Sequence, residues 1–275
     1  MRRLIAALAA LALAACSPVP VPRRAPYHPS DADLSVTRIV HGSVILGLRG
    51  TRVVIDPWFH SGLLQRQTEP LGLTPEGLPA LAAVLVTRGG TGHVDERALR
   101  ALAATVPEAI APAALAPRLE RLGFERVTPL GWWDTAHVGG ITVTAVPARR
   151  GPPRNGYVLE ADGVRAYFMS DTRPFDALVD VATRFPRPDV ALLWVGGTRL
   201  FGFEREMGPE DAARAAALLD ARRVVPLGYG ERGGLPLRWH ARRPVARFTS
   251  ACAAQGIDAS RVVVLEPGES WHYYR

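Results

Sequence analysis

The sequence predicts an α/β fold in which two mixed β-sheets are flanked by helices within one domain, residues 34–275. The chain has 275 residues, a length in the range of one large domain, and its 48% apolar content can supply a full core. Along the chain, runs with the composition of strands alternate with runs that have the apolar spacing of helices. Two sheets covered by helices fit this order.

The first half of the domain begins with strands. Three β-rich runs follow one another, separated by turns at Gly42 and at Arg49-Gly50. After a further apolar run, Asp95 is placed to cap a helix, and Gly123 is placed to end the next one. The expected strands are residues 35–40, 43–49, 51–57 and 83–86, and the expected helices are residues 96–104 and 112–123.

The second half mixes hairpin strands, helices and buried strands. Ala161-Asp162-Gly163 predicts a tight hairpin turn between two strands. Long apolar runs are typical of strands that are buried on both faces. The expected strands are residues 141–148, 157–161, 164–170, 189–196, 222–228 and 261–268, and the expected helices are residues 175–185, 209–219 and 243–255.

The first residues have the composition of a bacterial targeting segment. Arg2-Arg3 precedes an Ala/Leu run, residues 4–15, that is too short to span a bilayer as a helix. The run ends in Leu-Ala-Ala-Cys, which resembles a lipobox. We therefore expect residues 1–15 to be a lipoprotein signal peptide and Cys16 to carry lipid. The alternative is an ordinary secretory signal in which this cysteine occurs by chance.

A lipidated Cys16 has consequences for compartment and partners. Ser17 follows it instead of the Asp that favours inner-membrane retention, so we expect an outer-membrane lipoprotein facing the periplasm. Residues 16–33 are Pro-rich and predict an extended tether. Cys252 would be the only thiol left, buried on an apolar helical face, so no internal disulfide is possible. No array of arginines and aromatic residues indicates nucleic acid as a partner.

Residues 84–96, VLVTRGGTGHVDE, resemble a loop of the metallo-β-lactamase superfamily in which T-H-x-H-x-D-H holds two zinc ions. Other segments are similar to the branch that includes N-acyl-phosphatidylethanolamine phospholipase D and its bacterial relatives. Their order and spacing imply the αββα sandwich of that superfamily. The segments are RIVHGSVILGLRGTRVVIDPWF (38–59), LGWWDT (130–135), ITVTAVPARR (141–150), YFMSDTRPF (167–175) and VVPLGYG (224–230).

The resemblance implies seven metal-ligand positions. Members of this branch hydrolyse phospholipid phosphodiesters or lactone-type esters with a metal-activated hydroxide. In this chain only His93 and Asp171 keep a ligand type, and Asp171 aligns with the metal-bridging aspartate. Arginine and glycine cannot replace the others, because arginine stays charged without an acceptor and glycine has no side chain. The five replaced positions are Arg88, Gly90, Gly92, Arg150 and Gly228.

Two functions stay open from the sequence. One is a degenerate, non-catalytic or metal-poor protein that has no zinc and binds an anionic small molecule or lipid. There, His93 is a leftover ring that hydrogen-bonds in its loop, and Asp56 ties the loop backbone together. The other is an active hydrolase with a displaced single zinc site. Its ligands would be His60, His93, Asp171 and His240.

The two arginine replacements suggest what fills the changed site. If the fold is kept, Arg88 and Arg150 project toward Asp171, and a guanidinium can neutralise a buried carboxylate through paired, charge-assisted hydrogen bonds. With Arg149 and Arg154 nearby, the cleft would stay positive and suit phosphate or carboxylate ligands. The alternative is that both arginines point to solvent.

Overall fold

The structure is a computed structural model that describes residues 27, 30–62, 65–90, 92–148, 154–172, 177–233 and 238–275. The expected signal peptide, Cys16, most of the expected tether and Arg150 lie outside these residues. Among the described residues, none of the helices has the length and apolar character needed to cross a membrane.

The described residues form two large sheets. The first has the order β18-β1-β2-β3-β5-β6-β7. Strand β1 lies antiparallel between β18 and β2, and β3, β5, β6 and β7 run parallel to one another. These strands are β1 (Leu34–Val40), β2 (Ser43–Leu48), β3 (Thr51–Ile55), β5 (Ala83–Leu85), β6 (Glu108–Pro112), β7 (Arg126–Leu130) and β18 (Ser270–Tyr273).

The second sheet has the order β15-β12-β11-β10-β9-β8. Strands β11, β12 and β15 are parallel, and β8 to β11 form antiparallel pairs. The strands are β8 (Thr135–Val138), β9 (Ile141–Pro147), β10 (Asn155–Ala161), β11 (Val164–Phe168), β12 (Val190–Trp194) and β15 (Arg223–Leu227). Two small sheets pair β13 (Arg199–Leu200) with β14 (Phe203–Glu204) and β17 (Arg238–Trp239), and β4 (Gln65–Gln67) with β16 (Glu231–Gly233).

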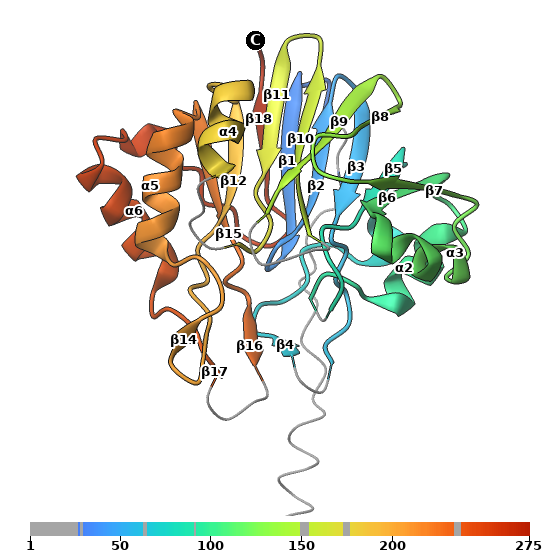
Figure 1. The fold of residues 1–275 in the computed structure, drawn as a ribbon, viewed down its shortest axis with the longest axis horizontal. Coiled ribbons are helices and arrows are strands. Elements are labelled where there is room, and N and C mark those ends of the chain that lie inside the picture. Colours follow the sequence, from blue (N-terminus) through green and yellow to red (C-terminus); the bar gives the residue numbers. More distant parts are fainter. Residues whose placement is uncertain are drawn as a thin grey trace, which may run out of the picture.

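Helices cover the outer face of each sheet (Figure 1). Helices α2 (Glu96–Ala103) and α3 (Ala116–Arg121) lie on the side of the first sheet. Helices α4 (Ala177–Arg184), α5 (Pro209–Leu219) and α6 (Pro244–Ala254) cover the second. The αββα sandwich that the sequence predicts is therefore confirmed. Short 3-10 turns are η1 (Pro75–Gly77), η2 (Ala113–Leu115) and η3 (Ala259–Arg261).

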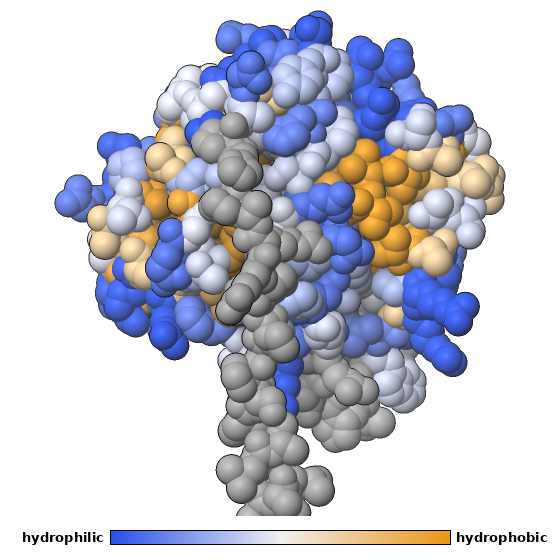
Figure 2. Space-filling view, turned by 180° about the vertical axis from the view of Figure 1, so that it is seen from behind, coloured by the Kyte–Doolittle hydropathy of each residue, from blue (hydrophilic) through white to orange (hydrophobic). Residues whose placement is uncertain are grey.

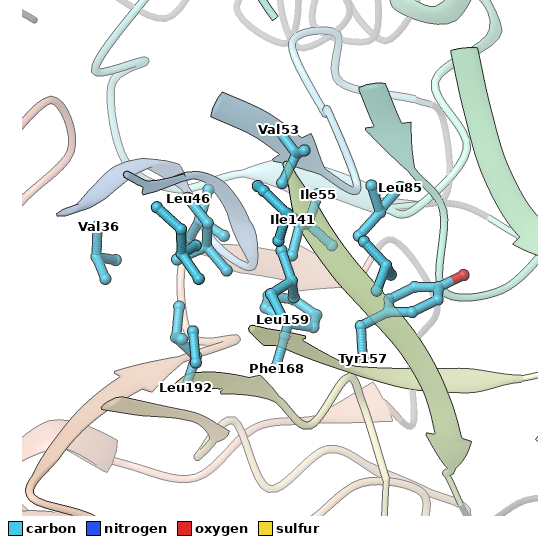
Figure 3. Packing of buried hydrophobic residues seen from close by; sticks show 14 of the residues in the cluster. Val36, Leu46, Val53, Ile55, Leu85, Ile141, Tyr157, Leu159, Phe168 and Leu192 are labelled. Atoms are coloured by element: carbon cyan, nitrogen blue, oxygen red, sulfur yellow. The ribbon is translucent and has the colours of Figure 1, made fainter. Parts of the chain in front are cut away.

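The main core lies between the two sheets (Figure 3). Val36 and Leu46 of the first sheet and Leu159 and Phe168 of the second contribute fully buried side chains. Each such side chain stabilises the fold by about 1.5–3 kcal/mol relative to an exposed one. Two further apolar clusters lie between each sheet and its helices. On the rear face of the molecule, hydrophobic residues gather in patches surrounded by hydrophilic ones (Figure 2).

Local sequence signals explain several element boundaries. Asp95 caps α2 by accepting a hydrogen bond from the backbone N–H of Ala98. Asp162 and Gly163 both have positive φ, as a tight two-residue hairpin turn requires, and they join β10 to β11. Gly123 follows α3 with a φ of 105°, a conformation that glycine adopts without strain.

Three sequence predictions differ from the structure. Residues 261–268 form no strand beyond a single bridge between Val262 and Val224, and the edge of the first sheet is taken by β18. The expected helix at 112–123 is a 3-10 turn followed by α3, because Pro112 still belongs to β6. Strands β6 and β7 were not predicted. Their segments, EAIAP and RVTPL, each contain a proline, which is uncommon inside a strand, so the pairing with neighbouring strands determines them.

Candidate functional site

The candidate site lies where parallel strands of both sheets end. Asp56 follows β3, Arg88 lies shortly after β5, and Asp171 lies shortly after β11. Residues at the carboxyl ends of neighbouring parallel strands come together at one edge, which is where α/β proteins place ligand sites. The sandwich therefore brings segments from both halves of the chain to one end of the molecule.

Asp56 organises the loop that follows β5. Its carboxylate accepts hydrogen bonds from the backbone N–H of Thr87 at 2.8 Å and from the Thr87 hydroxyl at 2.6 Å. The Nδ1 atom of His93 lies 2.7 Å from the same carboxylate, and both side chains are buried. Asp56 thus ties the loop together, as the sequence predicts. The His93 ring hydrogen-bonds in the loop as expected.

Two arginines hold the carboxylate of Asp171. Nε of Arg88 donates to Oδ1 at 2.7 Å, and Nη2 of Arg88 lies 2.6 Å from Oδ2, so the guanidinium spans both oxygens. Nη1 of Arg154 donates to Oδ1 at 2.9 Å. The Asp171 side chain is 3% exposed, whereas Arg88 and Arg154 are 16% and 19% exposed. The ion pair expected between Arg88 and Asp171 is present.

The second arginine is Arg154, which sequence reasoning placed only in the neighbourhood. It immediately precedes β10 and pairs with Arg88 through an isolated β-bridge. This backbone pairing joins the two loops and directs both guanidinium groups to one carboxylate. The local sequence contains no signal for such a contact. Arg150, which was expected with Arg88 to face Asp171, lies outside the described residues.

Charges in this cluster stabilise one another. Burial disfavours ionisation of Asp171, but the positive charge of Arg88, with that of Arg154 beside it, keeps the pKa of its carboxyl below the usual value. Burial also disfavours the charge on Arg88, yet Asp171 outweighs this effect and raises the pKa of that guanidinium. Asp171 is therefore an anion held between cations.

The other proposed zinc ligands have separate roles. His60 places Nδ1 2.9 Å from Oδ2 of Asp95, the residue that caps α2. His240 places Nδ1 3.1 Å from the hydroxyl of Thr198. His93 comes nearest to Asp171, with 3.8 Å between Nε2 and Oδ2. In the described part of the chain, no three His, Cys, Asp or Glu side chains are arranged to hold a metal, so the displaced site does not assemble.

The glycines at positions where the resemblance implies metal ligands have backbone conformations that suit glycine. Gly90, Gly92 and Gly228 have φ values of 110°, 83° and 80°. A Cβ atom at Gly92 would come within 3.0 Å of the side chain of Gln65. A larger residue at any of these positions would therefore be strained, and at Gly92 it would also require Gln65 to move.

The donor set does not fit the two zinc ions that the resemblance implies. A catalytic zinc needs at least three protein ligands, and at this locus His93 and Asp171 are the described residues that keep a ligand type. Both oxygens of Asp171 are already bonded to arginine. A divalent ion would have to displace guanidinium groups and then face their positive charge.

A sequence profile of the β-lactamase superfamily domain matches residues 51–229. The chain belongs to this superfamily. It is 32% identical to a UPF0173 metal-dependent hydrolase of Myxococcus xanthus over 234 residues, which are 75% of this chain and 74% of that protein. A second UPF0173 metal-dependent hydrolase, from Rubrobacter xylanophilus, is 30% identical over 68% of this chain and 77% of its own length.

Solved structures agree on the fold of this superfamily member. Igni18, a metallo hydrolase of Ignicoccus hospitalis, has a TM-score of 0.71 at 22% identity, covering 88% of this chain and 99% of its own. A possible metal-dependent hydrolase of Veillonella parvula has a TM-score of 0.73 at 20% identity, covering 88% of this chain and 100% of its own. The superfamily named from the sequence is confirmed, and the phospholipase D branch stays a prediction.

Proposed function

We propose that this superfamily member is a metal-poor, non-hydrolytic protein, anchored through lipid on Cys16, that binds an anionic ligand beside its arginine cluster. The observation that carries this proposal is the paired contact of Arg88 with Asp171, strengthened by Arg154. The two guanidinium groups supply the positive charge that Asp171 would otherwise take from metal ions.

The arginine cluster replaces metal in its structural role but not in its chemistry. A guanidinium neutralises a carboxylate and fixes the loops around it through directed hydrogen bonds. It has no open coordination position, and it does not generate a hydroxide nucleophile as a zinc ion does. The relatives are named metal-dependent hydrolases. This chain departs from the superfamily pattern at the positions that would hold the metals.

The same cluster supports an anion as ligand. Arg88 and Arg154 both bond to the carboxylate of Asp171, with Glu206 and Asp56 exerting smaller effects on Arg88, and both arginines are partly exposed. Trp132, 44% exposed, donates its indole N–H to the carbonyl of Arg154 at 2.7 Å and so lies beside the cluster. A phosphate or carboxylate group suits this combination of charge and access.

Metal content tests the first part of the proposal. Protein purified without chelator is expected to contain less than about one zinc ion per chain by elemental analysis. A catalytic zinc needs three protein ligands, and His93 and Asp171 are the two described residues at this locus that keep a ligand type. Hydrolysis of phosphodiester and lactone test substrates should stay at the level of a buffer control. Two tightly held metal ions per chain would show that the arginine cluster opens to admit them, and the proposal would be wrong.

Thermal stability in phosphate tests the second part. Inorganic phosphate should raise the Tm of the wild-type chain more than that of Arg154→Gln, which removes one charge from the cluster. Chloride at equal ionic strength controls for screening. Arg199→Gln is a matched control, because Arg199 pairs with Glu204 away from the cluster and is 54% exposed. Equal shifts in all three proteins would exclude an anion site here.

A further inference from the structure

Trp194 is a buried aromatic residue at the centre of the candidate site. It ends β12 and is 2% exposed. Its ring is stacked on His93, with 5.6 Å between ring centroids and an interplanar angle of 23°, and it meets His41 edge-on at 4.9 Å. Its indole N–H donates to Glu206 at 3.1 Å. The position of the ring is thus determined on several sides.

Two glycines make room for this ring. A Cβ atom added at Gly228 would come within 3.0 Å of three indole atoms, Cε2, Cδ2 and Nε1. A Cβ atom added at Gly42 would come equally close to Cζ3 and Cη2, in the six-membered part of the ring. Real Cβ atoms essentially never approach so closely. The indole therefore occupies the space into which a side chain at 228 would project.

Gly228 is also the position at which the resemblance places the last histidine ligand. With Trp194 present, a histidine there has no space for its side chain. The same ring covers His93, which is 1% exposed, from the side of β12. The indole thus covers one face of the imidazole and takes the space of a side chain at 228, while Nε2, at the edge of the His93 ring, lies 3.8 Å from Oδ2 of Asp171.

We infer that Trp194 replaces the histidine at 228 together with its metal, and that it closes the His93 side of the site to ligands. This inference rests on the proposed function and deepens it. Trp194 determines specificity, because an anion reaches the arginine side of the cluster and not the imidazole of His93. The residues at 194 and 228 share one volume. The large ring at the end of β12 fills it, and the residue after β15 must therefore be glycine.

A double-mutant cycle at positions 194 and 228, measured by Tm, tests this exchange independently of metal binding. Gly228→Ala should lower the Tm strongly when Trp194 is present and much less in a Trp194→Ala background, where the added methyl group has space. Gly50→Ala is the matched control, because Gly50 has a similar φ of 82° and nothing within 4 Å of an added Cβ. It should lower the Tm by about 2–4 °C through backbone strain alone.

The outcomes of the cycle separate the inference from its alternatives. A loss in the Trp194 background at least roughly twice that of the glycine control supports the exchange. Failure of Gly228→Ala to fold supports it as well if the same change folds alongside Trp194→Ala. Equal losses in both backgrounds, each measured against the same background with Gly228, would overturn it, since the cost would then not come from the indole.

Zinc uptake tests closure of the His93 side. A chain with Arg88→His, Gly90→His, Gly92→Asp, Arg150→His and Gly228→His should bind no more zinc than wild type while Trp194 remains. Adding Trp194→Ala should raise zinc uptake, measured by elemental analysis and by a zinc-dependent shift in Tm. Full zinc loading with Trp194 in place would overturn the inference. Zinc in the unchanged chain would instead contradict the proposed function, so the two failures can be distinguished.

Discussion

Asp171 is almost fully buried, with 3% of its side chain exposed, and depends on Arg88 and Arg154 for its stability as an anion. Transfer of an unpaired carboxylate into a protein interior is costly, whereas a carboxylate with charge-assisted hydrogen bonds on both oxygens is tolerated. Removal of either arginine therefore leaves a buried charge that is only partly compensated. At the scale of single residues, this cluster is where substitutions should have the largest electrostatic effect.

Asp171→Asn should lower the free energy of unfolding by about 3–5 kcal/mol at neutral pH, the range for breaking a buried ion pair. The loss with Asp171→Asn and Arg154→Ala combined should be smaller than the sum of the single losses, because both remove the same interaction. Denaturant unfolding measures each variant. Glu204→Gln is the control, since the exposed Arg199–Glu204 pair should contribute at most about 1 kcal/mol. Strict additivity would contradict a shared cluster.

The stabilisation by Asp171 should also depend on pH. Its folded pKa lies below the ordinary 3.8, so the folded state favours the ionised carboxylate. The stabilisation is complete above the unfolded pKa and is lost as the pH falls through the lower folded pKa. The stability difference between wild type and Asp171→Asn should therefore be constant near neutrality and shrink below about pH 4. A difference that grows on acidification would contradict this assignment.

Cys252 should be inert in the folded protein. It is fully buried in the cluster between the second sheet and its helices, and burial raises the pKa of its thiol to about 11. In a Cys16→Ser chain, a thiol reagent at pH 8 should label Cys252 only when denaturant unfolds the protein. Cys252→Ala provides the background signal. Rapid labelling of the native chain would show that α6 opens.

At the scale of elements, one aspartate joins a helix to a distant loop. Oδ1 of Asp95 accepts from the N–H of Ala98 and caps α2, while Oδ2 accepts from the backbone N–H groups of Phe59 and His60. His60, a candidate metal ligand in the sequence, lies in this second contact through Nδ1. The segment after β3 is thereby fixed to the start of α2, next to the loop that carries His93.

Asp95→Ala should lower the free energy of unfolding by about 2 kcal/mol or more, since it removes a helix cap and the partners of two buried or partly buried N–H groups. Asp258→Ala is the matched control. Asp258 caps only η3, at an exposed position, and its loss should cost less than about 1 kcal/mol. Thermal or denaturant unfolding compares the two. Equal effects would mean that the contacts to Phe59 and His60 contribute nothing.

Elements with a strong local pattern were predictable, and contacts between distant segments were not. The strands around Asp56, the cap at Asp95 and helix α5 follow from alternation, capping and periodicity. Strand β18 was missed because its role comes from pairing with β1, far away in the sequence. The contact of Arg88 with Asp171 was expected only because both residues match ligand positions of the resembling family, and no local pattern predicts it. Arg154 and Trp194 enter the site only through sheet pairing and stacking.

At the scale of the whole molecule, the sequence predicts attachment to a membrane through Cys16. Cys16→Ala should abolish incorporation of a fatty-acid analogue in the native host and shift the protein from the membrane fraction to the soluble fraction. Cys252→Ala, which removes the other cysteine, should leave both unchanged. Wild-type protein that is unlabelled and soluble would show that the lipobox resemblance is coincidental.

The contact between Trp194 and Gly228 also limits how this chain can change over evolutionary time. A histidine at 228 introduced while the indole is present collides with it, and an alanine at 194 introduced first leaves a cavity in the core. Either single step toward a metal site therefore lowers stability before any new activity can be selected. Reversal therefore requires substitutions at 194 and 228 at the same time, or a chain stable enough to tolerate one of the two substitutions alone.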